Sequence, residues 1–218
     1  MDLMCYGSDE DLSAQLWYRL LNSGLRLAAS VGTDALLDRE TLPLGGERVY
    51  VKVDGKFTME SWLDGLKAGR SFVTNGPMLA LRVNGQGMGE TVRIAAPGKV
   101  RIEAEVQSAF PLSSLELIVD GNTVRSEPCP AKQGGGIVVK QLVADIAMER
   151  SGWVALRARG PESRHVFDGP AWAHSSPVFV TVAGKPIASK KDASFFVEWI
   201  DRLIDSMGRR NQIGRAHV

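Results

Sequence analysis

The first part of the chain alternates helical and strand-like hydrophobic patterns. Apolar side chains recur three and four positions apart over residues 12–21, which predicts an amphipathic helix over Asp9–Gly24. Ser8 or Asp9 can cap the start of this helix. Arg26–Gly32 follows as a short apolar run typical of a buried strand. A helix, a tight loop and a buried strand form the unit from which α/β layers and barrels are built.

A second unit of the same kind precedes a change of pattern. Arg48–Val53 is predicted as a strand and Met59–Ala68 as an amphipathic helix. From Arg70 onward, short alternating stretches separated by turn pairs such as Asn84-Gly85 and Asp120-Gly121 predict a β-sandwich of immunoglobulin-like type. The predicted strands are 72–74, 78–83, 91–94, 99–107, 115–119, 136–145, 152–159 and 177–182.

The chain then returns to a helical pattern. Apolar residues over Phe195–Ile204 form one stripe, so this helix is expected to dock on an apolar surface of an earlier part of the same chain. The last residues, 213–218, fit no element and resemble the translation of a sequencing adapter. We expect them to be a non-native tail, and His217 within it is discounted.

The composition argues against several classes of partner and metal site. The 218 residues are 44% hydrophobic and 23% charged, which is typical of a soluble globular protein. Lys plus Arg number 26 against 25 for Asp plus Glu, so no nucleic-acid partner is expected. No apolar run reaches the length of a membrane span, and no membrane partner is expected. Two cysteines, Cys5 and Cys129, cannot build a four-thiolate metal site.

Asp34 is the most suggestive acidic residue, because it follows directly on a predicted buried strand. Carboxylates at the carboxyl end of such strands lie on the open face of α/β sheets and barrels, where metal binding and acid–base chemistry occur. The alternative is that Thr33 or Asp34 caps a following turn.

Two other segments carry candidate site residues. In Gly69–Pro77, Arg70 could steer an anion, and Thr74 and Asn75 could bind substrate; the alternative is a turn held by Gly76 and Pro77. His174 is the one histidine beside hydroxyls, but no Gly-x-Ser-x-Gly elbow accompanies it, so a structural hydrogen-bonding role competes with a site-lining one. A further hypothesis is that Ser175 or Ser176 acts with His174 in hydrolysis.

Three blocks of this sequence resemble the carbaryl-hydrolase-like (CehA/McbA) metallohydrolases of the PHP (polymerase and histidinol phosphatase) superfamily. They are Leu16–Gly24 with Ala29–Ala35, then Arg48–Val53 with Ser61–Pro77, and finally Ala173–Pro177. The Gly-Arg-Ser-Phe-Val-Thr-Asn-Gly-Pro block is the most specific of them, and the likeness covers nearly the whole chain except the tail.

The resemblance implies a particular fold and a metal site of which only part lies in this chain. It implies an α+β chain in which residues 1–75 are the C-terminal remnant of a PHP-type (β/α) barrel. Residues 76–184 would form the β-sandwich and 185–212 a closing amphipathic helix. Gly32-Thr33-Asp34 resembles the last metal motif of such barrels, with Asp34 as a ligand to a divalent metal. The expected second ligand position is occupied by Leu36, and no histidine precedes His165, so the early ligands have no counterpart.

The resemblance implies a metal-dependent hydrolase that acts on an ester, amide, carbamate or phosphoester. The missing ligands indicate that this chain is the C-terminal part of such an enzyme. Its expected partners are a missing N-terminal part of the same polypeptide and a small-molecule substrate. The chain alone is expected to be inactive, and no catalytic residue is assigned within it. Met1 would then be an internal methionine or the start of a fragment, and localisation stays open. The rival hypothesis is a non-catalytic β-sandwich module that binds a polymer or partner.

Overall fold

The computed structural model describes residues 1–5, 7–35, 44–129, 136–162, 166 and 169–215. The described residues form mostly β-strands, with three helices among them. In chain order the elements are β1 (Asp2–Met4), α1 (Glu10–Asn22), β2 (Ser30–Val31), β3 (Arg48–Val51), α2 (Met59–Lys67), β4 (Ser71–Thr74), β5 (Met78–Val83), β6 (Thr91–Ile94), β7 (Gly98–Ser108), β8 (Ser114–Val119), β9 (Asn122–Pro128), β10 (Val138–Met148), β11 (Gly152–Glu162), β12 (Pro170–Ser175), β13 (Val178–Val182) and α3 (Lys190–Arg215).

Two sheets contain most of these strands. In the eight-stranded sheet, β11 is central: it pairs antiparallel with β8 and also with both β12 and β13. Strands β4 and β3 continue the sheet beyond β12, β9 continues it beyond β8, and β6 lies parallel to β13. The second sheet is antiparallel, in the order β10-β7-β5.

The main core lies between these two sheets. Strand β5 alternates exposed and buried positions from Met78 to Val83, because only one of its faces meets the core. Val154, Leu156 and Ala158 of β11 point into the same cluster from the large sheet. This alternation is the period-two pattern that predicts a sandwich from sequence.

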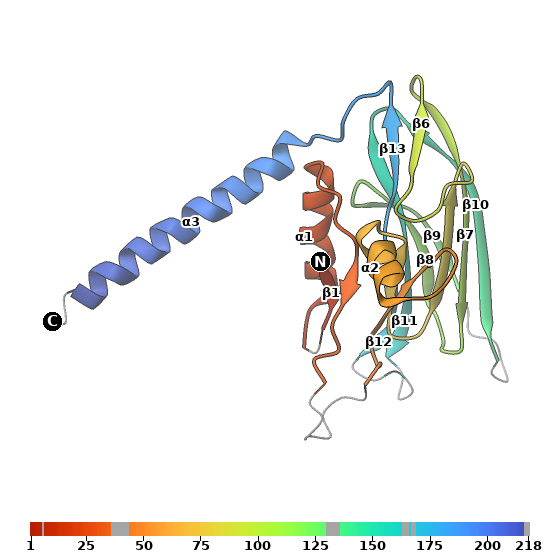
Figure 1. Ribbon diagram of the computed structural model, residues 1–218, viewed down its shortest axis with the longest axis horizontal. Coiled ribbons are helices and arrows are strands. Elements are labelled where there is room, and N and C mark those ends of the chain that lie inside the picture. Colours follow the sequence, from red (N-terminus) through yellow and green to blue (C-terminus); the bar gives the residue numbers. More distant parts are fainter. Residues whose placement is uncertain (6, 36–43, 130–135, 163–165, 167–168, 216–218) are drawn as a thin grey trace.

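A second core lies on the opposite face of the large sheet, where α1 and the β1–β2 pair pack (Figure 1). Trp17 of α1 is fully buried, with its ring centroid 6.4 Å from that of Trp153 in β11. Trp172 and Phe179 belong to the same cluster. Strand β11 is therefore covered on both faces, which explains why its first residues are buried without alternation.

The helices begin where the sequence offers capping side chains. The Asp9 carboxylate accepts a hydrogen bond of 2.9 Å from the Leu12 amide at the start of α1. Thr58 and Ser61 form a reciprocal capping box at the start of α2. Both helices agree with the predicted spans to within two residues at each end.

The expected fold class, with a PHP-type barrel remnant at its start, is wrong. Such a barrel needs successive parallel strands, but β3 pairs antiparallel with β4, and β4 pairs antiparallel with β12. These strands therefore extend the large sandwich sheet, and the described residues show no barrel remnant. Strands β1 and β2 are parallel with α1 between them, yet they form a two-stranded sheet of their own. The two packed sheets are compatible with the expected sandwich.

Helix α3 extends away from the sandwich (Figure 1). It touches α1 near its start, where Asp192 forms an ion pair of 3.0 Å with Arg19 and the Arg19 guanidinium lies over the Phe195 ring. Farther along, Trp199, Leu203 and other apolar side chains are more than half exposed, so the expected docking on an earlier segment is limited to the start of the helix. Among the helices of the described segments, none is both long and apolar enough to cross a membrane.

Candidate functional site

Asp34 lies just beyond the carboxyl end of β2, in the parallel β1–α1–β2 unit. Its φ of 51° is in the left-handed region, which Asp tolerates better than most residues. The residue is exposed. Next to it, the Thr33 hydroxyl donates a hydrogen bond of 3.1 Å to the Glu47 carbonyl, which ties this loop to the residue before β3. Asp34 thus carries a solvent-accessible carboxylate, and the residue before it, Thr33, is held by a hydrogen bond to Glu47.

The metal-ligating side chains of the described residues do not by themselves form a metal site. No group of three or more His, Cys, Asp or Glu side chains that could hold a metal ion comes together within the described ranges. Hydrolytic metal centres need several such ligands. The position of Leu36, and the turn that Thr33 or Asp34 could cap, lie outside the described residues, as do His165 and His217.

The three sequence blocks that carry the resemblance meet in space at Ala29. The Ser176 hydroxyl accepts a hydrogen bond of 3.1 Å from the Ala29 amide, and the Ser71 hydroxyl donates one of 3.3 Å to the Ala29 carbonyl. The two hydroxyl oxygens are 3.0 Å apart, and both serines are buried. Ala29 directly precedes β2, so these serines fix the strand that leads to Asp34.

The Thr74–Pro77 turn carries the chain from one sheet to the other, since β4 belongs to the large sheet and β5 to the small one. Thr74 Oγ1 accepts a hydrogen bond of 2.8 Å from the Gly76 amide. Asn75 accepts one of 2.7 Å from the Trp172 amide and donates one of 2.8 Å to the Pro170 carbonyl. A Cβ on Gly76 would overlap the Phe110 ring. The polar groups of Thr74 and Asn75 are therefore engaged in holding this crossing.

Arg70, the other candidate from this block, lines a cavity of about 580 Å³ beside β3, β4 and β5. Within the described part of the chain, neither Asp34 nor Arg70 makes a hydrogen bond or ion pair with Thr74, Asn75 or His174. The predicted site residues thus divide among three places: the exposed loop of Asp34, the cavity of Arg70 and the buried crossing near β12.

His174 lies in β12 and is completely buried. Burial raises the pKa of Tyr18 to about 12, so its hydroxyl keeps its proton and donates a 2.5 Å hydrogen bond to Nε2 of His174. The proton of the neutral imidazole then lies on Nδ1, which donates to the Ser175 carbonyl at 2.8 Å. Burial, together with the charges of Arg157 and Arg159, lowers the pKa of His174 to about 3. Both ring nitrogens are satisfied inside the protein.

The serine hydroxyls next to His174 are bonded elsewhere. Ser175 Oγ accepts a hydrogen bond of 2.9 Å from the Leu156 amide, and Ser176 Oγ is held by Ala29 and Ser71. Among the described residues, neither hydroxyl forms a hydrogen bond with the imidazole, whose partners are Tyr18 and the Ser175 carbonyl. The geometry therefore lacks the serine–histidine hydrogen bond on which nucleophilic hydrolysis depends.

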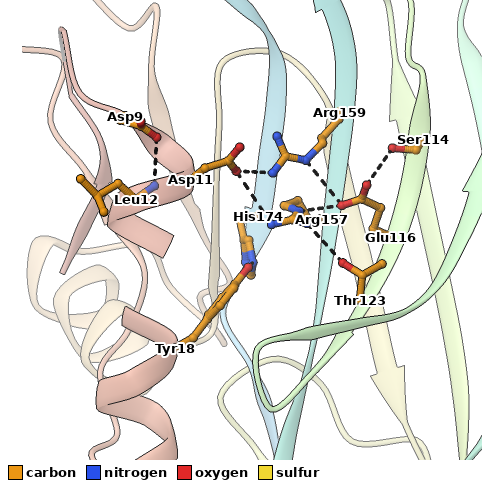
Figure 2. Close-up of polar contacts among 10 residues, drawn as sticks. All are labelled: Asp9, Asp11, Leu12, Tyr18, Ser114, Glu116, Thr123, Arg157, Arg159 and His174. Atoms are coloured by element: carbon orange, nitrogen blue, oxygen red, sulfur yellow. Dashed lines mark hydrogen bonds and ion pairs between the residues drawn. The ribbon is translucent and has the colours of Figure 1, made fainter. Parts of the chain in front are cut away.

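A charged cluster above His174 was not found by sequence reasoning. Figure 2 shows Asp11 of α1 reaching Arg159 and Arg157 of β11, which also meet Glu116 of β8. Arg157 Nε lies 2.7 Å from a Glu116 oxygen, and both side chains are 14% exposed. The hydrogen bond from Arg159 is the main cause that lowers the pKa of Asp11. The sequence contained one indication of this cluster. Arg157 and Arg159 are two positions apart in a predicted strand, and alternate side chains of a strand share a face.

Comparisons with family models, with curated proteins and with solved structures yield no match for this chain.

Proposed function

We propose that this chain is part of a metal-dependent hydrolase and that Asp34 is its contribution to a metal site completed by residues outside the chain. The proposed reaction class is hydrolysis of an ester, amide, carbamate or phosphoester. The observation that carries the proposal is the meeting of the three resembling blocks at Ala29, with the exposed Asp34 carboxylate five residues farther along the chain.

The residues of this chain act by holding Asp34 in place. Ser71 and Ser176 use their hydroxyls to position the backbone of Ala29 before β2. Thr33, directly before Asp34, donates a hydrogen bond to the Glu47 carbonyl. A divalent metal bound with additional ligands would supply an activated water. Because the described residues offer too few ligands together, we expect the chain alone to be inactive.

The test compares metal content between the 218-residue chain and a version extended by its upstream coding region. After dialysis against Mn²⁺ or Zn²⁺, the extended protein should retain metal in stoichiometric amount and the shorter chain only traces. Asp34→Asn removes the carboxylate charge and keeps a residue that accepts positive φ, so the extended variant should lose metal. Asp64→Asn, at an exposed position on α2, is the matched control and should retain it.

Two outcomes would contradict this proposal. An extended protein that retains no divalent metal would remove the hydrolase assignment. An Asp34→Asn variant that holds as much metal as Asp64→Asn would remove Asp34 from the site.

The cavity at Arg70 favours a second candidate, a non-catalytic sandwich module that binds a ligand. This function would use the sandwich alone and would not depend on Asp34. Ligand binding by the 218-residue chain, unchanged by Asp34→Asn, together with an extended protein that holds no metal, would favour the module over the hydrolase.

A further inference from the structure

The cavity at Arg70 has the size and lining of a small-molecule site. Its volume of about 580 Å³ falls within the range of roughly 300–1,000 Å³ that is usual for ligand pockets. Four segments of the chain contribute its walls: the end of β3, the start of β4, the middle of β5 and the turn that follows β5. Every lining residue belongs to the described part of the chain.

One wall is apolar and aromatic. Tyr50 of β3 and Phe72 of β4 are cross-strand partners, and their rings stack with centroids 5.1 Å apart and planes 8° from parallel. Leu79 and Leu81 of β5 are buried in the sandwich core behind the cavity, so this wall is fixed by the fold. Tyr50 itself is 39% exposed. A flat ring can therefore pack against this wall with little rearrangement of the protein.

The charged side chains of the lining are mainly cationic. Lys52, Arg70 and Arg82 all line the cavity, and Glu90 is the single acidic residue among the lining side chains. The Glu90 carboxylate accepts a 2.5 Å hydrogen bond from the Gly87 amide. Lys52 forms an exposed ion pair of 3.5 Å with Asp54. The lining thus has a surplus of positive charge, which attracts anions.

The two guanidinium groups keep free donors. Arg70 Nε donates to the Lys52 carbonyl at 3.5 Å, and Arg82 Nη1 donates to the Gly85 carbonyl at 3.1 Å. In the described ranges neither arginine forms an ion pair with a carboxylate, unlike Arg157 with Glu116. Arginine forks bind carboxylate and phosphate groups through paired hydrogen bonds.

We propose that this cavity binds a small organic anion that joins a planar ring to a carboxylate or phosphate group. Arg70 and Arg82 hold the anionic group, and the ring packs against the Tyr50–Phe72 pair. This site is separate in its residues from the Asp34 loop, and it does not rest on the metal proposal. It gives the sandwich a binding role of its own.

The probes are benzoate and phenyl phosphate, titrated into the 218-residue chain by calorimetry or by amide chemical shifts. Benzamide tests the need for charge, and acetate and inorganic phosphate test the need for a ring. Benzoate or phenyl phosphate should bind more tightly than all three of these comparison probes. Preference between the two ring-bearing anions distinguishes a carboxylate site from a phosphate site.

The variants locate the binding. Arg70→Gln and Arg82→Gln should each weaken binding about tenfold, the loss expected for one charge-assisted contact. Tyr50→Ala should weaken ring-bearing probes and leave acetate unchanged. Arg93→Gln, at an exposed arginine outside the cavity lining, is the control and should bind like the unaltered chain.

The proposal is overturned if benzamide binds as tightly as the better of benzoate and phenyl phosphate, or if Arg70→Gln and Arg82→Gln both behave like Arg93→Gln. Absence of binding by both anions at millimolar concentration also overturns it. Asp34→Asn should leave probe binding unchanged, so failure here and failure of the metal proposal are separate results.

Discussion

The Tyr18 hydroxyl donates a 2.5 Å hydrogen bond to Nε2 of His174, across 156 positions of sequence. Tyr18 lies in α1 and His174 in β12. Trp17 and Trp172 flank the same imidazole, with ring centroids 5.3 and 5.6 Å from it. This contact joins the β1–α1–β2 unit to the large sheet through a polar pair inside an aromatic cluster.

Tyr18→Phe should destabilise the protein. The change leaves Nε2 of His174 as a buried acceptor with no hydrogen-bond donor, which costs about 1–3 kcal/mol of unfolding free energy. Urea denaturation measures the loss. Tyr50→Phe, at an exposed tyrosine, is the matched control and should change stability by less than about 0.5 kcal/mol. Equal effects of the two changes would contradict the importance of the Tyr18–His174 contact.

His174 should make the protein less stable in mild acid. Its pKa is near 3 in the folded chain and near 6.5 when exposed, so between these values the unfolded state binds the extra proton. The contribution of His174 is complete above about pH 6.5 and falls as the pH is lowered, by at most about 1.4 kcal/mol per pH unit. Urea midpoints between pH 7 and pH 4 follow it. His174→Gln should flatten this slope, and an unchanged slope would exclude His174 as its source.

Glu116→Gln should destabilise the protein by removing the carboxylate that joins β8 to the arginines of β11. The change removes the carboxylate that pairs with Arg157 at 2.7 Å, where both side chains are largely buried. Removing one partner of a buried ion pair costs about 3–5 kcal/mol, and partial access to water reduces this to about 2 kcal/mol here. Glu103→Gln, in the exposed pair with Arg101, should cost less than about 1 kcal/mol. Chemical denaturation of both variants provides the comparison, and a smaller loss for Glu116→Gln than for Glu103→Gln would refute it.

Asn75→Ala should reduce stability through the sheet crossing. The variant loses the acceptor of the Trp172 amide and the donor to the Pro170 carbonyl, at a cost of about 1–3 kcal/mol. Asn122→Ala, at the exposed first residue of β9, serves as the control and should unfold at nearly the original temperature. If Asn75→Ala matches that control in a thermal melt, the amide does not hold the crossing.

Local patterns predicted many of the elements. The strands Met78–Val83 and Thr91–Ile94 were predicted with the bounds that the structure has, because one face of each meets the core and alternation is visible. Asn84-Gly85 and Asp120-Gly121 have positive φ at both positions, as the turn pairs predict. Strand β9 was missed because its residues are nearly all exposed and show no alternation, and β12 because its Pro-Ala-Trp-Ala-His-Ser sequence has a weak strand pattern.

The candidate site was predictable in part. Asp34 and Arg70 could be chosen from their local surroundings, since one follows a strand and the other is a cation beside a turn. The hydrogen bonds of Thr74 and Asn75 and the pairing of Tyr18 with His174 could not be predicted from local sequence. Their partners come from segments that no periodicity connects, such as Asn75 with Trp172.

The sequence by itself determined the helices α1 and α2, the sandwich-like run of strands and the exposed acidic residue after β2. These features follow from capping, hydrophobic period and turn chemistry, which act over a few residues. Only the tertiary structure decided that β3 and β4 join the sandwich sheet rather than a barrel, and that Ser71 and Ser176 meet at Ala29. Strand direction and pairing depend on which distant backbone groups satisfy each other's hydrogen bonds, and local sequence does not encode that choice.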